Sequence, residues 1–372
     1  SKWIFPVQPK QKRASLKPNN LLRKETIKMG DNKEQTDIQS LLAQKDTSKL
    51  SSFLKEQIVE YKNSEMFKNY LDFVAKCPRY SNRNIRFLIK QKPDIGRVGT
   101  FTKWKEQGLH IKKGSKGYKI FMPIIKDKYE NGKPVLDEKG KKVREVKGFK
   151  LGTVFEDKQL VEYENLPKQV EYLNQDPNNT KDLFMALSEV SEVKIGLKPL
   201  EVDGFYSPQD KCIFINANLH GADLIHTLIH EVTHSKLHTK SEAIFGDKQY
   251  TLQELEAEST AYIVANNYDI DTSKYTMGYL NSWGLDKISN EELQGVMENI
   301  QKTAREIIEK IDLELEKRKN IEPTKSKLQT EIQEAKKEQK ELLKKHEEKQ
   351  KKKPKKESKL DSFKNKFKGK GE

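Results

Sequence analysis

The segment that most constrains this chain is HTLIHEVTHSKLH, residues 226–238, in which four histidines recur at intervals of four residues. Residues four apart lie on the same face of an α-helix, about 6 Å apart along its axis. The first and last of these histidines would be about 18 Å apart on such a helix, so at most one adjacent pair can bind the same metal ion. The spacing therefore predicts a helix that presents two imidazole rings to one metal.

Only one adjacent pair of these histidines encloses a glutamate. His230, Glu231 and His234 form the pattern H-E-x-x-H, in which the two histidines bind zinc and the glutamate acts as general base toward water at the metal. We therefore predict a zinc ion (Zn²⁺) with His230 and His234 as ligands and Glu231 as the catalytic base. His226 is expected to pack beside the site or to hold a ligand in place, and His238 to act as a cation at the C-terminal end of the helix.

A catalytic zinc usually has three protein ligands and one open coordination position. We expect the third ligand in the helical segment at about 251–267, where Glu254 and Glu258 share a face and Glu256 lies almost opposite. Glu254 is predicted as the ligand, and Glu258 as the partner of the far ring nitrogen of a ligand histidine; Glu258 as the ligand is the alternative. Glu256 is expected to be exposed to solvent.

The segment KCIFIN, residues 211–216, has the composition of a short strand that precedes the histidine helix. We expect it to be an edge strand, against which an extended substrate peptide can lie. Together with the metal site, this is the plan of a zincin-type metallopeptidase that acts on a protein substrate.

Hydrophobic periodicity indicates an α+β protein. Helical spacing covers about 37–76, strands are expected at 117–125 and 148–156, and helices dominate after residue 168. Between the strands, the charged excursion 126–147 contains the turn signals Asn-Gly and Lys-Gly. These changes predict four regions: a flexible leader (1–36), an α+β domain (37–165), a mostly helical domain (168–312), and a charged helix with a basic disordered tail (313–372).

The charge of the chain is strongly basic. The net charge is +15, and residues 344–372 alone hold thirteen lysines against five acidic residues. An excess of this size indicates a polyanionic partner, most simply nucleic acid. The two cysteines give no disulfide framework. No apolar run is long enough to span a bilayer and the first residues lack the apolar core of a signal peptide, so we expect a cytoplasmic protein.

Three short motifs in the first half of the chain point to a known family. They are Tyr80, Ser81 and Asn84 in YSNRN, Phe101 and Trp104 in FTKW, and Ile111, Gly114, Lys116 and Gly117 in IKKGSKG. With the histidine helix following them, the chain resembles ArdC-type antirestriction proteins and the related LtrC-like proteins of conjugative plasmids over about residues 60–265. The resemblance implies a domain that binds single-stranded DNA, then a zincin-like metallopeptidase domain, and protection of incoming plasmid DNA during conjugation. The excursion 126–147 and the lysine-rich tail match nothing in this resemblance.

Lysines and aromatic residues alternate in the same part of the chain, from Lys103 to Phe121. Cations that follow phosphates, with aromatic rings on which bases stack, suit sequence-tolerant binding of single strands. The predicted DNA-binding residues are Tyr80, Asn84, Trp104, Lys112, Lys113 and Lys116. The alternative is that the rings belong to the core and that the lysines are only solvated.

These observations lead to one main hypothesis and two alternatives. The main hypothesis is a mobile-element protein that binds single-stranded DNA and carries a zinc metallopeptidase site. The first alternative is a non-catalytic protein that coats DNA and holds a structural zinc, and the second is a regulatory metallopeptidase that cleaves a DNA-bound repressor. Glu231 favours an enzyme, because a structural zinc site has no use for a general base.

Overall fold

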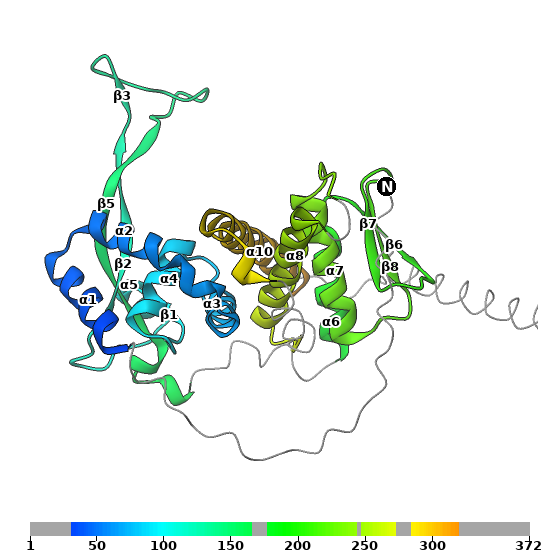
Figure 1. The fold of residues 1–372 in the computed structure, drawn as a ribbon, viewed down its shortest axis with the longest axis horizontal. Helices are drawn as coiled ribbons and strands as arrows, with labels where there is room; N and C mark the ends of the chain where they lie inside the picture. Colours follow the sequence, from blue (N-terminus) through cyan, green and yellow to red (C-terminus); the bar gives the residue numbers. More distant parts are fainter. Residues whose placement is uncertain (1–30, 166–176, 244–246, 273–283, 320–372) are drawn as a thin grey trace, which may run out of the picture.

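The computed structural model describes residues 31–165, 177–243, 247–272 and 284–319. An N-terminal half of helices and a small sheet is followed by a mainly helical second half (Figure 1), so the predicted α+β class is confirmed. Within the described residues, no helix is both long enough and apolar enough to cross a membrane.

The first half opens with four helices. They are α1 (Asp31–Gln44), α2 (Thr47–Glu56), α3 (Ser64–Lys76) and α4 (Asn82–Gln91), with the 3-10 helix η1 (Gln57–Lys62) between α2 and α3. Capping residues divide this stretch: Asp46, Asn63 and Ser81 accept hydrogen bonds from backbone N–H groups in the first turn of the helix that follows each of them. Helix α1 begins at Asp31, inside the predicted leader, and residues 1–30 lie outside the described residues.

A three-stranded antiparallel sheet follows these helices. Its strands, in the spatial order β1-β5-β2, are β1 (Val98–Gly99), β5 (Arg144–Glu156) and β2 (Tyr118–Asp127). The short helix α5 (Phe101–Glu106) lies between β1 and β2 in the chain, and the 3-10 helices η2 (Asp157–Gln159) and η3 (Tyr163–Asn165) follow β5. The strands predicted at 117–125 and 148–156 are confirmed, although β5 begins four residues earlier than expected.

The charged excursion between these strands is ordered. Strand β3 (Tyr129–Glu130) pairs with β4 (Lys133–Pro134) around a turn in which Asn131 and Gly132 both have positive φ. With the ends of β2 and β5, this tip projects from the rest of the molecule (Figure 1). Positive φ suits the Asn-Gly pair that the sequence shows at this turn.

The second half combines one small sheet with four helices in its described part. Its elements are α6 (Pro177–Val190), β6 (Lys194–Lys198), β7 (Gly204–Ser207), β8 (Cys212–Asn216), α7 (Gly221–Leu237), α8 (Lys248–Asn267), η4 (Leu285–Lys287) and α10 (Asn290–Lys319). Strand β8 lies between β6, which is parallel to it, and β7, which is antiparallel. The predicted strand is confirmed, but its expected place at the sheet edge is wrong, because hydrogen bonds to β6 and β7 occupy both of its sides.

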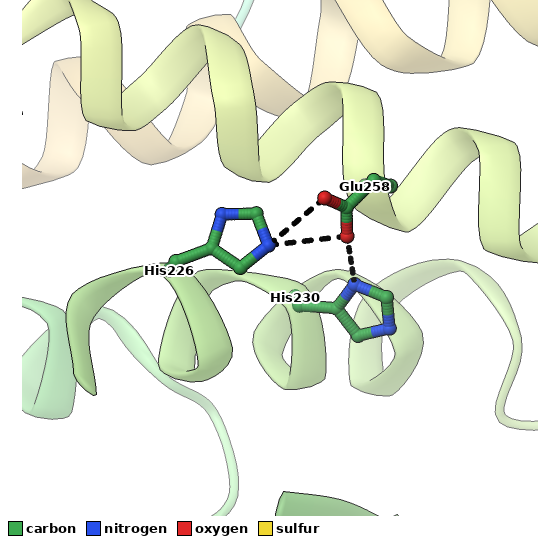
Figure 2. Close-up of side chains that lie close together, drawn as sticks. All are labelled: His226, His230 and Glu258. Atoms are coloured by element: carbon green, nitrogen blue, oxygen red, sulfur yellow. Dashed lines mark hydrogen bonds and ion pairs between the residues drawn. The ribbon is translucent and has the colours of Figure 1, made fainter. Parts of the chain in front are cut away.

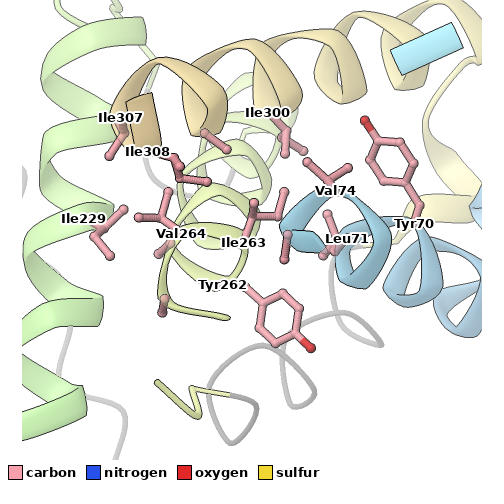
Figure 3. Packing of buried hydrophobic residues seen from close by; sticks show 14 of the residues in the cluster. Tyr70, Leu71, Val74, Ile229, Tyr262, Ile263, Val264, Ile300, Ile307 and Ile308 are labelled. Carbon is pink, nitrogen blue, oxygen red and sulfur yellow. The ribbon is translucent and has the colours of Figure 1, made fainter. Parts of the chain in front are cut away.

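The two halves share one hydrophobic core. Side chains of α3, α7, α8 and α10 meet in a single buried cluster (Figure 3), which includes Leu71, Ile229, Ile263 and Ile300. Polar contacts reinforce this junction: the Tyr70 hydroxyl donates to the Met297 carbonyl oxygen over 2.9 Å. The predicted domain boundaries stay a prediction, but the described parts of the two halves pack directly on each other.

Candidate metal centre

The predicted metal site lies between α7 and α8, which run side by side (Figure 1). Ile225, Leu228, Ile229 and Val232 follow the i, i+3, i+4, i+7 spacing of a helix face and are fully buried. This apolar face fixes α7 in the core and turns the neighbouring histidine face toward α8. All four histidines of the repeat are buried there.

The three predicted ligands converge. His230 Nε2 lies 3.0 Å from His234 Nε2. The Glu254 carboxylate faces both rings, with Oε2 3.6 Å from His230 Nε2 and Oε1 3.4 Å from His234 Nε2. These three side chains can each offer a ligand atom to one metal ion.

Glu258 lies behind the ligand His230, on the side away from His234. Its Oε2 is 3.2 Å from His230 Nδ1 and 3.1 Å from His226 Nε2 (Figure 2). Burial raises the pKa of this carboxyl, but the hydrogen bonds from His226 and His230 outweigh burial and lower the pKa to about 2. Glu258 is therefore a carboxylate whose contacts can orient His230, and His226 contacts it from the other side; its predicted role beside the metal stays a prediction.

His226, His230 and Glu258 are also close enough together to hold a metal ion as a group. This second trio shares His230 with the first and would use its Nδ1 atom instead of Nε2. The structure thus brings together both ligand sets that the sequence left open, one with Glu254 and one with Glu258.

A second buried chain of polar groups lies behind His234. His234 Nδ1 is 2.9 Å from His238 Nδ1, and His238 Nε2 is 2.8 Å from Glu256 Oε2. Asn299 of α10 then donates to Glu256 Oε1 over 2.7 Å. The expectation that Glu256 is solvent-exposed is wrong: the residue is 7 % exposed, because α10 covers that side of α8.

These contacts decide which ring nitrogens carry protons. A carboxylate only accepts hydrogen bonds, so His230 Nδ1 and His238 Nε2 carry protons toward Glu258 and Glu256. His238 Nδ1 is then an acceptor, and His234 Nδ1 donates to it. This pattern leaves Nε2 of both His230 and His234 with a lone pair directed at the other ring.

A divalent cation fits this arrangement. Two neutral rings with lone pairs facing across 3.0 Å repel each other unless a positive charge lies between them. Burial lowers the pKa of His230, and burial together with His238 lowers the pKa of His234 to about 3, so both rings are neutral at pH 7, as ligands must be. Among the described residues, Glu254 Oε1 and Glu258 Oε1 are both buried without a hydrogen-bond partner, so this feature does not separate the two sets. The Glu254 set is better suited because both of its Nε2 atoms offer a lone pair, whereas the Glu258 set would need His230 Nδ1, which carries a proton toward Glu258.

The predicted base, Glu231, is 2 % exposed. Burial raises its pKa well above the usual range, the nearby Glu254 carboxylate raises it further, and a hydrogen bond from the Tyr206 backbone N–H lowers it. Tyr206 belongs to β7, so this edge strand lies against the part of α7 that carries Glu231. A carboxylate with a raised pKa is a stronger proton acceptor than an exposed one.

The predicted DNA-binding residues of the first half fall into two groups. Asn84 is buried, where its side chain donates to the Phe121 carbonyl oxygen and accepts from the Phe121 N–H. Trp104 is also buried and donates from Nε1 to the Phe155 carbonyl oxygen, and the half-buried Tyr80 hydroxyl lies 3.4 Å from the Val98 carbonyl oxygen. The side-chain hydrogen bonds of Asn84 and Trp104 thus stabilise the fold. For Trp104 this agrees with the alternative that the aromatic rings of this segment belong to the core.

The three predicted lysines form the second group. Lys112, Lys113 and Lys116 are exposed in the loop that leads into β2. The Lys112 ammonium group donates one long hydrogen bond, over 3.3 Å, to the Lys158 carbonyl oxygen. These cations can reach a polyanion without breaking an ion pair of the described structure. A role of all six residues in DNA binding stays a prediction.

Comparison with known proteins gives matches for both halves. Residues 42–155 match the family model of the N-terminal domain of anti-restriction factor ArdC, and residues 190–269 match the IrrE N-terminal-like domain of the M78 peptidase family. An uncharacterised protein of Bacillus anthracis is 26 % identical over 326 residues, which are 76 % of this chain and 55 % of that protein. The chain thus spans about half the length of this curated relative.

Two solved structures are also similar to this chain. Both are crystal structures of the antirestriction protein ArdC from plasmid R388. The Mn(II)-bound form is 22 % identical, with a TM-score of 0.36 over 62 % of this chain and 85 % of that chain. The metal-free form is 23 % identical, with a TM-score of 0.35 over 63 % and 86 %. With an ArdC N-terminal domain followed by an IrrE-like peptidase domain that contains the histidine helix, the chain is an ArdC-type protein.

Proposed function

We propose that the protein binds single-stranded DNA through its N-terminal half and hydrolyses peptide bonds at a metal centre in its second half. In this proposal it protects incoming plasmid DNA from restriction, in the cytoplasm of the recipient cell. The observation that carries the catalytic part is the convergence of two histidine Nε2 atoms 3.0 Å apart on one partly buried glutamate carboxylate.

Zinc is the metal that we propose for this centre, because two histidines and one carboxylate are a common ligand set of catalytic zinc. His230, His234 and Glu254 would hold it. When bound, such a metal polarises a carbonyl group and makes water acidic enough to lose a proton near pH 7. Manganese is the second metal to test, since the solved R388 protein includes a Mn(II)-bound form.

The residues of the chain then take separate roles. Glu231 accepts a proton from the attacking water, and its burial keeps bulk water away from the carboxylate. An extended substrate peptide would add to the outer edge of β7, because β7 rather than β8 is the edge strand beside Glu231. Glu258 and His238 fix the two ligand rings through their far nitrogens.

The DNA-binding part rests on the match to the ArdC N-terminal domain and on the exposed cations of the loop before β2. Lys112, Lys113 and Lys116 would contact phosphates, so affinity should fall as salt rises, because each contact releases counterions. The non-catalytic alternative, a DNA-coating protein with a structural metal, is favoured less, because a buried glutamate lies on the ligand helix, next to His230, where a general base acts.

One set of variants tests both parts. Glu231→Gln should keep the metal and bind a labelled oligo-dT like the wild type, while cleavage of a peptide library falls at least about 100-fold. Replacing Lys112, Lys113 and Lys116 with alanine should weaken oligo-dT binding and leave the metal content unchanged. The matched control replaces Lys240, Lys287 and Lys302, three exposed lysines of the second half, with alanine.

Plasmid transfer into a restricting host then decides which activity protects the DNA. If transfer depends only on the three loop lysines, DNA coating is the working function. If it depends on Glu231 while metal and fold stay intact, cleavage is required. A Glu231→Gln protein that has lost its metal would contradict the role of Glu231 as a base outside the ligand set.

A further inference from the structure

The charged excursion that the sequence leaves unexplained forms a projecting arm. We use the name arm for residues 122–150, the distal parts of β2 and β5 with the β3–β4 tip (Figure 1). At its base, Phe121 is buried against Phe87 of α4, with ring centroids 4.9 Å apart. Beyond the Pro123–Phe149 pair the ribbon leaves this helix support, and both of its faces carry exposed side chains.

The arm exposes large apolar side chains along its two-stranded ribbon. Ile125 and Val146 lie directly opposite each other, next to a register shift between Ile124 and Ile125, and are 52 % and 54 % exposed. Tyr129 at the tip is 56 % exposed, and Phe149 nearer the base is partly exposed. Apolar side chains gathered on one projecting element are typical of a binding surface rather than of a solvated loop.

The charges of the arm indicate what that surface binds. Most of its carboxylates are neutralised within the arm itself: Asp127 pairs with Lys142, Glu130 with Lys128, and Glu145 with Lys147. Five lysines of the arm form no ion pair with any described residue: Lys126, Lys133, Lys139, Lys141 and Lys150. Lysines on strand edges also discourage aggregation, which accounts for some of them but not for the exposed Ile125–Val146 pair.

We propose that the arm is a second contact surface for single-stranded nucleic acid. Its lysines contact phosphates, while Tyr129, Phe149 and the Ile125–Val146 pair contact the faces of unstacked bases. A duplex keeps those base faces stacked inside and shows only base edges and phosphates, so it gains little from these apolar side chains. The guanidinium of Arg83, 3.8 Å from the centroid of the Phe149 ring, holds this ring in place at the base of the arm.

This inference rests on the proposed DNA binding by the N-terminal half and adds a length requirement to it. The loop lysines precede β2, and the arm tip follows β2. The ten residues of β2 span about 33 Å at 3.3 Å per residue. A short oligonucleotide can therefore contact only one of the two places, and a longer one can contact both.

The register of the ribbon allows the arm to be shortened cleanly. Asp127 and Arg144 are paired directly, so an Asn-Gly turn can replace residues 128–143 and close the hairpin at this pair. The deletion removes five lysines and three acidic residues, a net loss of two positive charges. The control with the same loss of charge is Lys287→Gln combined with Lys302→Gln, on the surface of the second half. Two point variants keep the arm: Tyr129→Ala, and Ile125→Thr with Val146→Thr.

The measurement is fluorescence anisotropy with oligo-dT of about six and about twenty nucleotides, at several salt concentrations. The shortened protein should bind the long oligonucleotide at least about tenfold more weakly than the wild type, with a smaller salt dependence, and the short one about equally. Tyr129→Ala should lose about fivefold or more on the long oligonucleotide, since one stacked base is lost. The charge control should match the wild type, and thermal melts should show that each variant is folded.

Three outcomes overturn the inference. If the shortened and point variants bind the long oligonucleotide like the wild type, the arm does not contact the strand, while DNA binding by the loop lysines stands. If the wild type prefers a duplex and the deletion removes that preference, the arm contacts duplex DNA instead. A wild type that binds neither form refutes the proposed function itself and, with it, this inference.

Discussion

Substitution of Glu256 offers the sharpest test of the contacts that support the proposed metal ligands. It should change the affinity for the metal although Glu256 is not itself a proposed ligand. In the structure Glu256 accepts from His238 over 2.8 Å and from Asn299 over 2.7 Å, and His238 in turn contacts His234. Glu256→Gln keeps an acceptor toward His238, because the amide of Asn299 can turn over and accept from the new amide group. This variant therefore removes the charge and preserves the hydrogen-bond chain.

The expected losses follow from the strength of these hydrogen bonds. A hydrogen bond to a charged group contributes about 1 kcal/mol more than a neutral one, so Glu256→Gln should weaken metal binding about fivefold. Glu256→Ala removes the acceptor as well, lets His238 and then His234 turn, and should cost about 10- to 100-fold in metal affinity. Glu242→Gln, which removes an exposed acid four residues along the chain from His238, is the matched control.

The assay is competition for Zn²⁺ against a chromophoric chelator at constant pH, combined with thermal melts of the metal-free proteins. The order of affinities should be wild type, Glu256→Gln and Glu256→Ala, with Glu242→Gln equal to the wild type. A Glu256→Ala protein that is less stable but binds zinc like the wild type would refute the reasoning, because Glu256 would then support only the packing of α8 against α10.

Three further predictions follow from the described contacts. Glu254→Gln or His234→Ala should remove most of the bound metal, whereas His226→Ala should keep most of it; the reverse result in equilibrium metal analysis would place the metal at the Glu258 trio. Glu192 lies 2.8 Å from Lys236 and 3.0 Å from Lys310, and hydrogen bonds from these lysines lower its pKa to about 2, so its stabilising effect is present above about pH 4.5 and is lost as the pH falls toward 2. Since its side chain is largely exposed, Glu192→Gln should cost under about 1 kcal/mol at pH 7 and nothing near pH 2 in urea titrations, and a difference that persists there would contradict the assignment. Asn84→Ala leaves the N–H and carbonyl of Phe121 unpaired and should destabilise the fold by about 2–4 kcal/mol, and an unchanged melting temperature with weakened DNA binding would instead make Asn84 a DNA contact.

The sequence predicts the helical part of the site well because that part depends on local spacing. Two histidines four apart around a glutamate define one face of α7, and Glu254 and Glu258 define one face of α8 in the same way. Their expected roles needed only the assumption that the two helices meet. The structure places them together through apolar faces whose periodicity is also visible in the sequence.

The features that the sequence did not predict depend on contacts between distant segments. Glu256 is buried by Asn299, 43 residues later in the chain, and nothing local indicates that α10 reaches it. Strand β7 has only four residues, too few for an alternating pattern to stand out, so the sequence alone does not place β8 inside the sheet. The motifs that contain Trp104 and Asn84 predict DNA contacts, while in the structure the side chains of both residues hydrogen-bond to backbone groups of β5 and β2.

The packing of helix α8 explains why its sequence alone does not show which of its glutamates are exposed to solvent. It has no solvated face over most of its length, because α7, α10 and α3 cover three sides of it (Figure 3). Each side makes its own polar contact. Glu254 and Glu258 face histidines of α7. Glu256 accepts a hydrogen bond from Asn299 of α10, and the Tyr262 hydroxyl donates one to Asp72 of α3. Tyr262 lies one turn after Glu258, so the N-terminal half contacts the same helix that carries Glu254, the proposed third ligand. The predicted DNA-binding half is therefore part of the scaffold of the proposed metal centre, and a metal site built from residues 168–312 alone would lack one of the three supports of α8.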